Sequence, residues 1–156
     1  MAQMKITTKD AVNGYGILKE LKVSTLSDKA MMGIWKDIKT LRPIHEEWQK
    51  DIEEVAKTLQ DEEYTKMQTR LQNAQQREAK VNAKEYALTE DDKKDIAEIN
   101  AYFAAFNEKS KQYLEELGSK EHEVDICKVG DEELLKAMKA SGKGFAEMEV
   151  LEWLVE

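Results

Sequence analysis

A long helix is predicted by residues 28–59, DKAMMGIWKDIKTLRPIHEEWQKDIEEVAKTL. In this stretch, apolar side chains recur at steps of three and four residues. This spacing places the apolar side chains on one side of a helix and is typical of a coiled coil or a long bundle helix. Ser27 offers an N-cap, and Pro43 predicts a kink near residues 39–42 rather than a complete break. The first apolar stripe consists of Met31, Ile34, Ile38, Leu41, His45, Trp48, Ile52, Val55 and Leu59.

A second stripe begins five residues after Leu59, so the regular spacing slips there. Either a turn forms at residues 61–63, or the helix continues while its stripe rotates about the axis. We expect continuation, because residues 60–63 contain no glycine or proline and good helix formers dominate as far as Ala87. A helix over residues 28–87 would be about 90 Å long at 1.5 Å per residue. The second stripe consists of Tyr64, Met67, Leu71, Ala74, Glu78 and Val81.

The chain turns back at Thr89, which offers an N-cap before the acidic residues 90–92. The helix that starts there is predicted to end before Gly118. We expect it to lie antiparallel to residues 59–81, while residues 31–55 pack with the terminal segments. Its stripe consists of Ile96, Ile99, Phe103, Phe106, Ser110, Tyr113 and Leu117.

The N-terminal segment predicts a short strand over residues 4–7, followed by a helix with Thr7 or Thr8 as its N-cap. Gly14 and Gly16 weaken this helix by about 1 kcal/mol each relative to alanine. Either the helix is broken at the glycines, or another backbone lies close against it.

The C-terminal segment supplies the rest of a small base. Alternating apolar residues predict a strand over residues 123–129, which would pair with the N-terminal strand. Residues 131–140 predict a short helix, and the apolar residues 145–155 are expected to be buried. The predicted fold is therefore mainly α: a long, coiled-coil-like antiparallel helical hairpin on a small α+β base formed by the two terminal segments.

This organisation fits one domain over residues 1–156, with a base of residues 1–58 and 118–156 and a projecting hairpin of residues 59–117. The 156 residues include 36% charged and 41% hydrophobic residues, which suits one compact domain with a helical extension. A collagen-like or wholly disordered chain is excluded by this composition.

The net charge of −8 disfavours direct binding to nucleic acids or to anionic membranes. Most of the excess lies in residues 118–156, which hold five basic and ten acidic residues. Such an excess either keeps a small domain soluble or steers a basic partner. The sequence contains no apolar run of membrane-spanning length, and its start lacks the core of a signal peptide, so we expect a soluble intracellular protein.

No motif for catalysis, cofactor or metal binding stands out, and we predict no enzyme and no cofactor. The Gly142-Lys143-Gly144 stretch lacks the spacing of a phosphate-binding loop. One cysteine and two histidines cannot complete a four-ligand zinc site. Cys127 and His122 would form a nucleophile and base only with further groups that the sequence does not supply. His45 lies on the first stripe, which favours a packing role over a ligand or a base.

The long helices suggest a surface for another protein or for a second copy of this chain. A partner helix in a groove needs large apolar anchors. We predict Trp35, Trp48 and Tyr102 as partner-binding residues. A homodimer is also expected, because residues 31–55 offer more apolar length than the terminal segments cover.

The order of parts resembles that of uncharacterised small helical proteins of phages and prophages. It is carried by the Met4-Lys5-Ile6 strand, the helix ending at residues 17–21, the charged hairpin, the Val124-Asp125-Ile126 strand and the closing residues 151–154. The resemblance implies a phage or prophage origin, and with it the host cytoplasm or the virion as location.

Two functions follow as hypotheses. The first is a non-enzymatic interaction or assembly protein, such as a phage morphogenesis factor or virion accessory. The second is a phage-encoded inhibitor of a host defence or nucleic-acid enzyme, which would act through an acidic surface as a decoy for phosphates.

Overall fold

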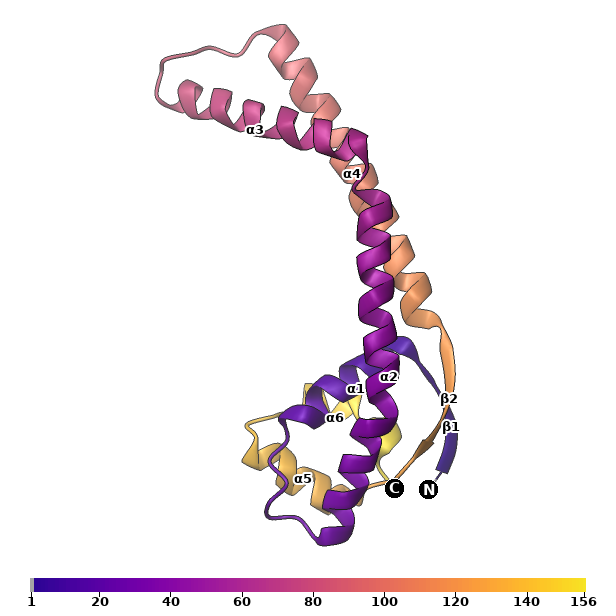
Figure 1. The fold of residues 1–156 in the computed structure, drawn as a ribbon. Helices are drawn as coiled ribbons and strands as arrows, with labels where there is room; N and C mark the ends of the chain where they lie inside the picture. The colour runs from indigo at the N-terminus through magenta and orange to yellow at the C-terminus, as the bar shows by residue number, and fades with distance from the viewer. Residues whose placement is uncertain (1) are drawn as a thin grey trace. The chain divides into compact units, whose positions relative to one another are not determined.

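The computed structural model describes residues 2–156 and is mainly helical, with one small sheet that joins the terminal segments (Figure 1). The predicted fold class is thereby confirmed. The elements in chain order are β1 (Ala2–Thr7), α1 (Thr8–Glu20), α2 (Asp28–Leu59), α3 (Glu62–Asn82), α4 (Glu90–Ser119), β2 (Glu121–Ile126), α5 (Asp131–Ala140), α6 (Phe145–Val150) and the 3₁₀ helix η1 (Glu152–Leu154).

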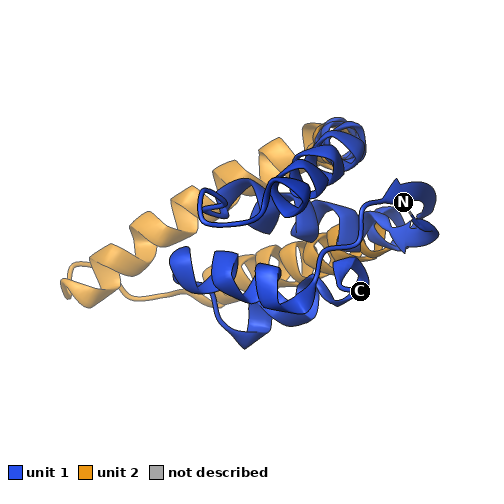
Figure 2. Ribbon diagram, turned by 90° about the horizontal axis from the view of Figure 1, so that it is seen from below, with its two compact units in different colours: residues 1–51, 116–156 blue, residues 52–115 orange. Residues whose placement is uncertain are grey.

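The chain forms two compact units (Figure 2). The terminal unit comprises residues 1–51 and 116–156, and the helical unit comprises residues 52–115. The units divide at residues 51/52 and 115/116, where the sequence predicts divisions at 58/59 and 117/118. Helices α2 and α4 each contribute residues to both units.

In the terminal unit, β1 and β2 form an antiparallel pair in which Met4 lies opposite Val124 and Ile6 opposite His122. The second strand begins two residues earlier than predicted and ends at Ile126. Val129 instead makes an isolated parallel bridge with Val155. Because Val129 N–H donates to the Leu154 carbonyl at 3.0 Å, the end of the chain is held against the core.

Helix α1 starts as the sequence predicts, since Asp10 N–H donates to the Thr7 hydroxyl at 3.1 Å. The helix runs unbroken through both glycines. A Cβ atom on Gly14 would lie 2.6 Å from Cζ2 of Trp153, whereas one on Gly16 would meet nothing within 4 Å. The predicted close approach therefore occurs at Gly14, and the atom that approaches belongs to a side chain rather than to a backbone.

One cluster of buried apolar side chains forms the core of the terminal unit and draws on the sheet, α1, α2, α5 and the closing segment. Leu151 and Leu154 are fully buried in it, as expected for residues 145–155. The expectation is wrong for Phe145, which is 85% exposed. Phe145 is the first residue of α6, and the side chains that α6 packs against the core come later, at Met148.

Helix α2 continues through Pro43 and ends at Leu59, so the predicted single helix over residues 28–87 is wrong. Asp61 begins a new helix because its carboxylate accepts the Tyr64 N–H at 2.9 Å. This cap competes with continuation of α2, because the Asp61 side chain bonds a backbone N–H at the start of a new helix. The five-residue step between the two apolar stripes occurs at the same place. Helix α3 ends at Asn82, five residues before the predicted end, and Lys84 then adopts a left-handed conformation with φ of 61°.

In the helical unit, α3 and α4 pack along their apolar stripes, as predicted. Met67 and Ala74 of α3 are buried with Ile99 of α4. Thr89 caps α4 reciprocally, since Asp92 N–H donates to the Thr89 hydroxyl at 3.1 Å and Thr89 N–H donates to the Asp92 carboxylate at 3.0 Å.

Candidate functional site

A groove of about 460 Å³ lies in the terminal unit between the end of α1, the following loop and the first turns of α2. Its floor is made of buried core residues such as Leu18 and Ile34, which are 1% and 2% exposed. The walls are formed by side chains of α1 and α2 that lie beside the buried faces of these helices. The lining residues are Leu18, Lys19, Leu21, Val23, Met31, Met32, Ile34, Trp35 and Ile38.

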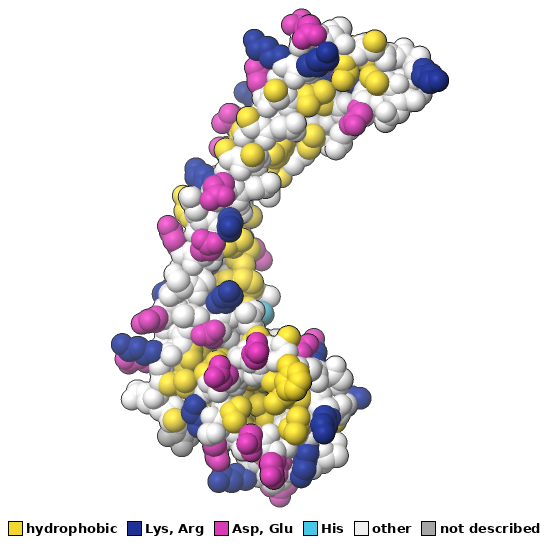
Figure 3. Space-filling model, turned by 180° about the vertical axis from the view of Figure 1, so that it is seen from behind, with side chains coloured by type: hydrophobic (Ala, Val, Ile, Leu, Met, Phe, Trp, Pro, Cys, Tyr) yellow, Lys and Arg dark blue, Asp and Glu magenta, His cyan; other side chains and the backbone are white. Residues whose placement is uncertain are grey.

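Two large side chains of α2, Met32 and Trp35, keep about half of their surface in contact with solvent, 48% and 49% respectively. They lie three residues apart and therefore on the same face of the helix. The Lys39 ammonium lies 4.2 Å from the centre of the Trp35 ring, which is a cation–π contact. The groove thus combines an aromatic wall with an adaptable methionine. Figure 3 shows that hydrophobic side chains gather on one face of this unit.

The charge around the groove is opposite to that of the whole chain. Residues 19–39 contain five lysines, all exposed, and none of them forms an ion pair among the described residues. The same stretch holds three acids, of which Glu20 is paired with Lys143, Asp37 is fully buried and Asp28 is exposed. The lysines are Lys19, Lys22, Lys29, Lys36 and Lys39. Lys19 in the lining and Lys39 over the Trp35 ring therefore place positive charge at the edge of an apolar groove, in a protein with a net charge of −8.

The three predicted partner-binding residues line three different cavities. Trp35 lines the groove, but Trp48 lines a different cavity of the terminal unit, of only about 10 Å³. A volume of that size holds at most one water molecule. His45 lies next to Trp48 and to Tyr15, with ring centres 6.2 and 4.6 Å away, as expected for a packed histidine.

Tyr102 belongs to the helical unit. It lines a cavity of about 180 Å³ and packs edge to face with Phe103, with ring centres 5.2 Å apart. Burial, followed by the charges of Asp61 and Glu63, raises the pKa of the Tyr102 hydroxyl above its ordinary value. Tyr102 is therefore part of an aromatic cluster of the helical unit with acidic neighbours.

His122 and Cys127 are not brought together. His122 Nε2 lies 2.7 Å from the Thr8 hydroxyl, which itself donates to the Lys120 carbonyl at 3.2 Å. A Cβ placed on Gly33 would lie 3.5 Å from Cβ of Cys127, so the thiol side chain lies toward α2. Five extended residues span about 16 Å, so a nucleophile and base pair is not formed.

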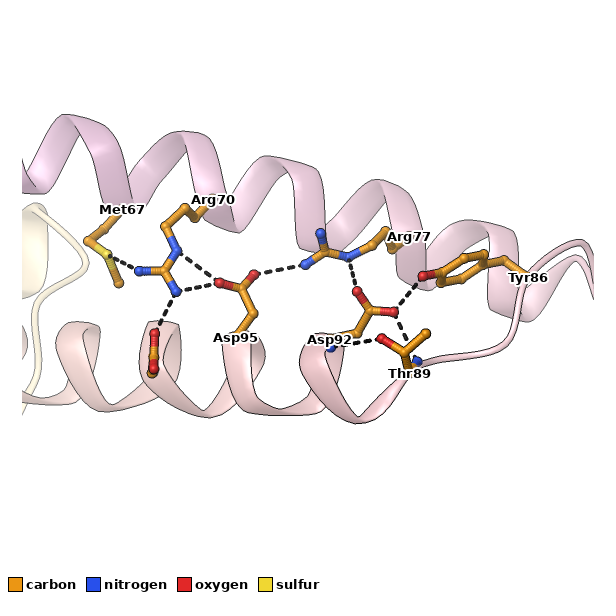
Figure 4. Close-up of polar contacts among 8 residues, drawn as sticks. Met67, Arg70, Arg77, Tyr86, Thr89, Asp92 and Asp95 are labelled. Atoms are coloured by element: carbon orange, nitrogen blue, oxygen red, sulfur yellow. Dashed lines mark hydrogen bonds and ion pairs between the residues drawn. The ribbon is translucent and has the colours of Figure 1, made fainter.

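A polar network joins α3 and α4 (Figure 4). Arg70 donates to Asp95 and Glu98, and Arg77 contacts Asp95 at 2.8 Å and Asp92 at 3.4 Å. The hydrogen bond from Arg70 holds the pKa of Asp95 below its ordinary value. The Tyr86 hydroxyl, which donates to Asp92 at 2.5 Å, has the same effect on the pKa of Asp92. Since every carboxylate here is matched by a donor, the network ties the two helices together.

Asp37 is a buried acid that our sequence analysis missed. One carboxylate oxygen accepts the Cys127 N–H at 2.7 Å, and the other has no hydrogen-bond partner within residues 2–156. Burial raises the pKa of Asp37 to about 7, although the Cys127 N–H and the charge of Lys128 lower it. Asp37 follows Ile34 by three residues and precedes Leu41 by four, so its place on the buried face could have been found from the spacing.

Comparisons of the chain with protein-family models, with curated proteins and with solved structures found no match. Over residues 2–156, the helices lack the combination of length and apolar character that a bilayer span requires. Within the same residues, no three histidine, cysteine or acidic side chains are grouped closely enough to hold a metal ion.

Sequence reasoning selected Trp35 but missed Met32 and Lys39, which complete its face of α2. The signal was present, because Met32, Trp35 and Lys39 follow one another at steps of three and four residues beside the first stripe. Leu21 and Val23 lie outside any regular helix face, so only the folded structure places them in the groove.

Proposed function

We propose that this chain is a non-enzymatic protein–protein interaction module that receives an apolar segment of a partner in the groove between α1 and α2. The observation that carries the proposal is the groove itself, about 460 Å³ in volume, with Met32 and Trp35 half exposed beside a buried floor. Tryptophan and methionine are enriched in protein interfaces, and tryptophans often supply a large share of the binding energy. Covering the exposed half of Trp35 contributes about 2 kcal/mol.

The chemistry of the lining favours a protein segment over a small molecule. Sites for small ligands place several polar groups so that they fix the ligand's orientation. Among the lining residues only Lys19 carries a charge, and the Trp35 indole N–H is the only other polar side-chain group. An amphipathic helix or an aromatic side chain needs no more than an apolar surface with charges at its edge.

The role we propose is assembly, of the kind that phages and prophages encode as morphogenesis factors or virion accessories. It is supported by the order of strand, helix, charged helices, strand and closing segment described above. Trp35 is the anchor in this proposal. The other two predicted anchors, Trp48 and Tyr102, line other cavities and stay predictions.

The test is a tagged pull-down from phage-producing and phage-free host lysates at low and moderate salt, followed by binding assays with each purified partner. Trp35→Ala should weaken binding by about thirty-fold, which corresponds to about 2 kcal/mol. Tyr113→Ala is the matched control, because Tyr113 is a 38% exposed aromatic residue of the helical unit. Equal affinities for both variants would contradict the groove as the binding site.

A second candidate function is inhibition of a basic nucleic-acid enzyme. Glu121, Glu123 and Asp125 alternate along β2 and are all exposed, so three carboxylates lie about 6.6 Å apart along one face of the strand. Only Lys5, opposite Glu123, adds a positive charge from β1. This function predicts binding that weakens steeply with salt and is lost in the triple variant E121Q/E123Q/D125N. Binding that is insensitive to salt would argue against it.

A further inference from the structure

We infer that the occupant of the groove is a second copy of this chain, which inserts Phe145 between α1 and α2 of the first. The inference rests on the proposed function, because it takes the groove to be a protein-binding site, and it names the partner. It also assigns a role to Phe145, which is far more exposed than the other exposed large apolar residues among positions 2–156.

Phe145 is held in its exposed position by a fixed turn. Gly144 N–H donates to the Glu147 carboxylate at 2.9 Å, and Met148 N–H donates to the Gly144 carbonyl at 3.1 Å. Lys143 N–H donates to the Met138 carbonyl at 2.9 Å. A side chain that projects from such a bonded turn loses little conformational freedom when it docks, which favours binding.

The turn that carries Phe145 lies beside the residues that line the groove. Lys143 pairs with Glu20, and Lys22 N–H donates to the Ser141 hydroxyl at 2.8 Å. Both partners come from the segment that also supplies Lys19 and Leu21 to the groove. The Phe145 ring and the groove lie next to each other on one unit. Two copies related by a two-fold axis can therefore each insert Phe145 into the groove of the other. Such an interface closes on itself as a dimer.

The charges of the two surfaces are complementary. Residues 145–156 contain four glutamates and no lysine or arginine. At the groove, Lys19 belongs to the lining and Lys39 lies over the Trp35 ring, and both lysines are exposed. Docking of α6 at the groove places acids near these lysines, which orients the two copies. At physiological salt the Debye length of about 8 Å screens the repulsion between two chains of net charge −8.

The experiment is sedimentation equilibrium of the purified full chain over a wide range of concentrations. We expect a reversible dimer whose dissociation constant rises at least ten-fold in Phe145→Ser and in Trp35→Ala. Tyr113→Ser should leave the dissociation constant unchanged. Because Phe145 is exposed, Phe145→Ser should keep the wild-type circular dichroism, and at concentrations where both proteins are monomeric it should keep the wild-type melting temperature, so a loss of the dimer would not reflect misfolding.

A mixing experiment tests the exchange itself. Phe145→Ser keeps an intact groove, and Trp35→Ala keeps an intact projecting ring, so an equimolar mixture restores one of the two contacts. The mixture should therefore form more dimer than either variant alone, detected by fluorescence energy transfer between differently labelled chains.

Three outcomes would overturn the inference. They are a wild-type chain that stays monomeric, a dimer that survives Phe145→Ser, and a mixture that gains no dimer. A monomeric chain that still loses its purified partner on Trp35→Ala would contradict the second copy alone and leave the proposed function standing.

Discussion

Gly14 shows how one missing side chain fixes the packing of the terminal unit. The ring of Trp153 occupies the space that a Cβ would need, and the neighbouring Leu151 is fully buried. Gly14→Ala forces the indole to move in a packed core, and we expect a loss of about 1 to 3 kcal/mol of unfolding free energy. Gly16→Ala should instead gain about 0.5 to 1 kcal/mol, because the site is open and alanine favours helix. Urea denaturation of both variants measures the difference, and a stable Gly14→Ala protein would contradict the contact.

Asp37 should make the stability of the protein depend on pH. Its pKa of about 7 in the folded chain lies above the ordinary value of 3.8, so the folded state holds a proton that the unfolded state has lost. Stability should therefore fall as the pH rises from about 4 to about 7, by up to about 1.4 kcal/mol per pH unit. Asp37→Asn still accepts the Cys127 N–H and removes this dependence. The measurement is the free energy of unfolding of the wild type and of Asp37→Asn between about pH 4 and about pH 7. If the difference between the two proteins does not change with pH, Asp37 is not buried as a neutral acid.

At the scale of elements, the boundary between α2 and α3 depends on the Asp61 cap. Asp61→Ala removes the acceptor of the Tyr64 N–H, and we expect the first turn of α3 to lose about 1 kcal/mol. Asp61→Asn keeps an acceptor oxygen and serves as the control. The measurement is amide hydrogen exchange at Tyr64, which should become faster in the alanine variant only. Unchanged exchange would indicate that packing, not the cap, ends α2.

At the scale of the whole molecule, the two units differ in what stabilises them. The terminal unit has an extensive buried core, whereas the apolar cluster between α3 and α4 has only Met67, Ala74 and Ile99 as its buried members among the described residues. The Arg70 and Arg77 network adds to that small cluster and is weakened by salt. Amides of α3 and of residues 90–105 should therefore exchange before those of Leu18, Leu41 and Ile126. High salt should increase the difference in exchange rate between the two units. Equal protection of the amides in both units would show that the helical unit is as stable as the terminal unit.

The sequence by itself determined the elements, because periodicity and capping are local properties of the chain. The three-residue and four-residue steps predicted helix over the residues of α2, α3 and α4, although as one helix over 28–87 in place of α2 and α3, and Thr7 and Thr89 marked the starts of α1 and α4. The alternation of residues 123–129 located β2 to within a few positions. The break at residues 60 and 61 was also encoded locally, in Asp61 and in the slip of the stripe. We predicted a continuous helix because residues 60–63 contain no glycine or proline and good helix formers follow them.

Only the tertiary structure decided which side chains meet and which stay in solvent. Gly14 meets Trp153 and Asp37 meets Cys127 across 139 and 90 positions of the chain. Phe145 looks like an ordinary apolar residue in the sequence, where we expected it to be buried, and only the folded chain shows that it is exposed. Such contacts depend on how distant segments pack at close to crystal density, which no local propensity encodes.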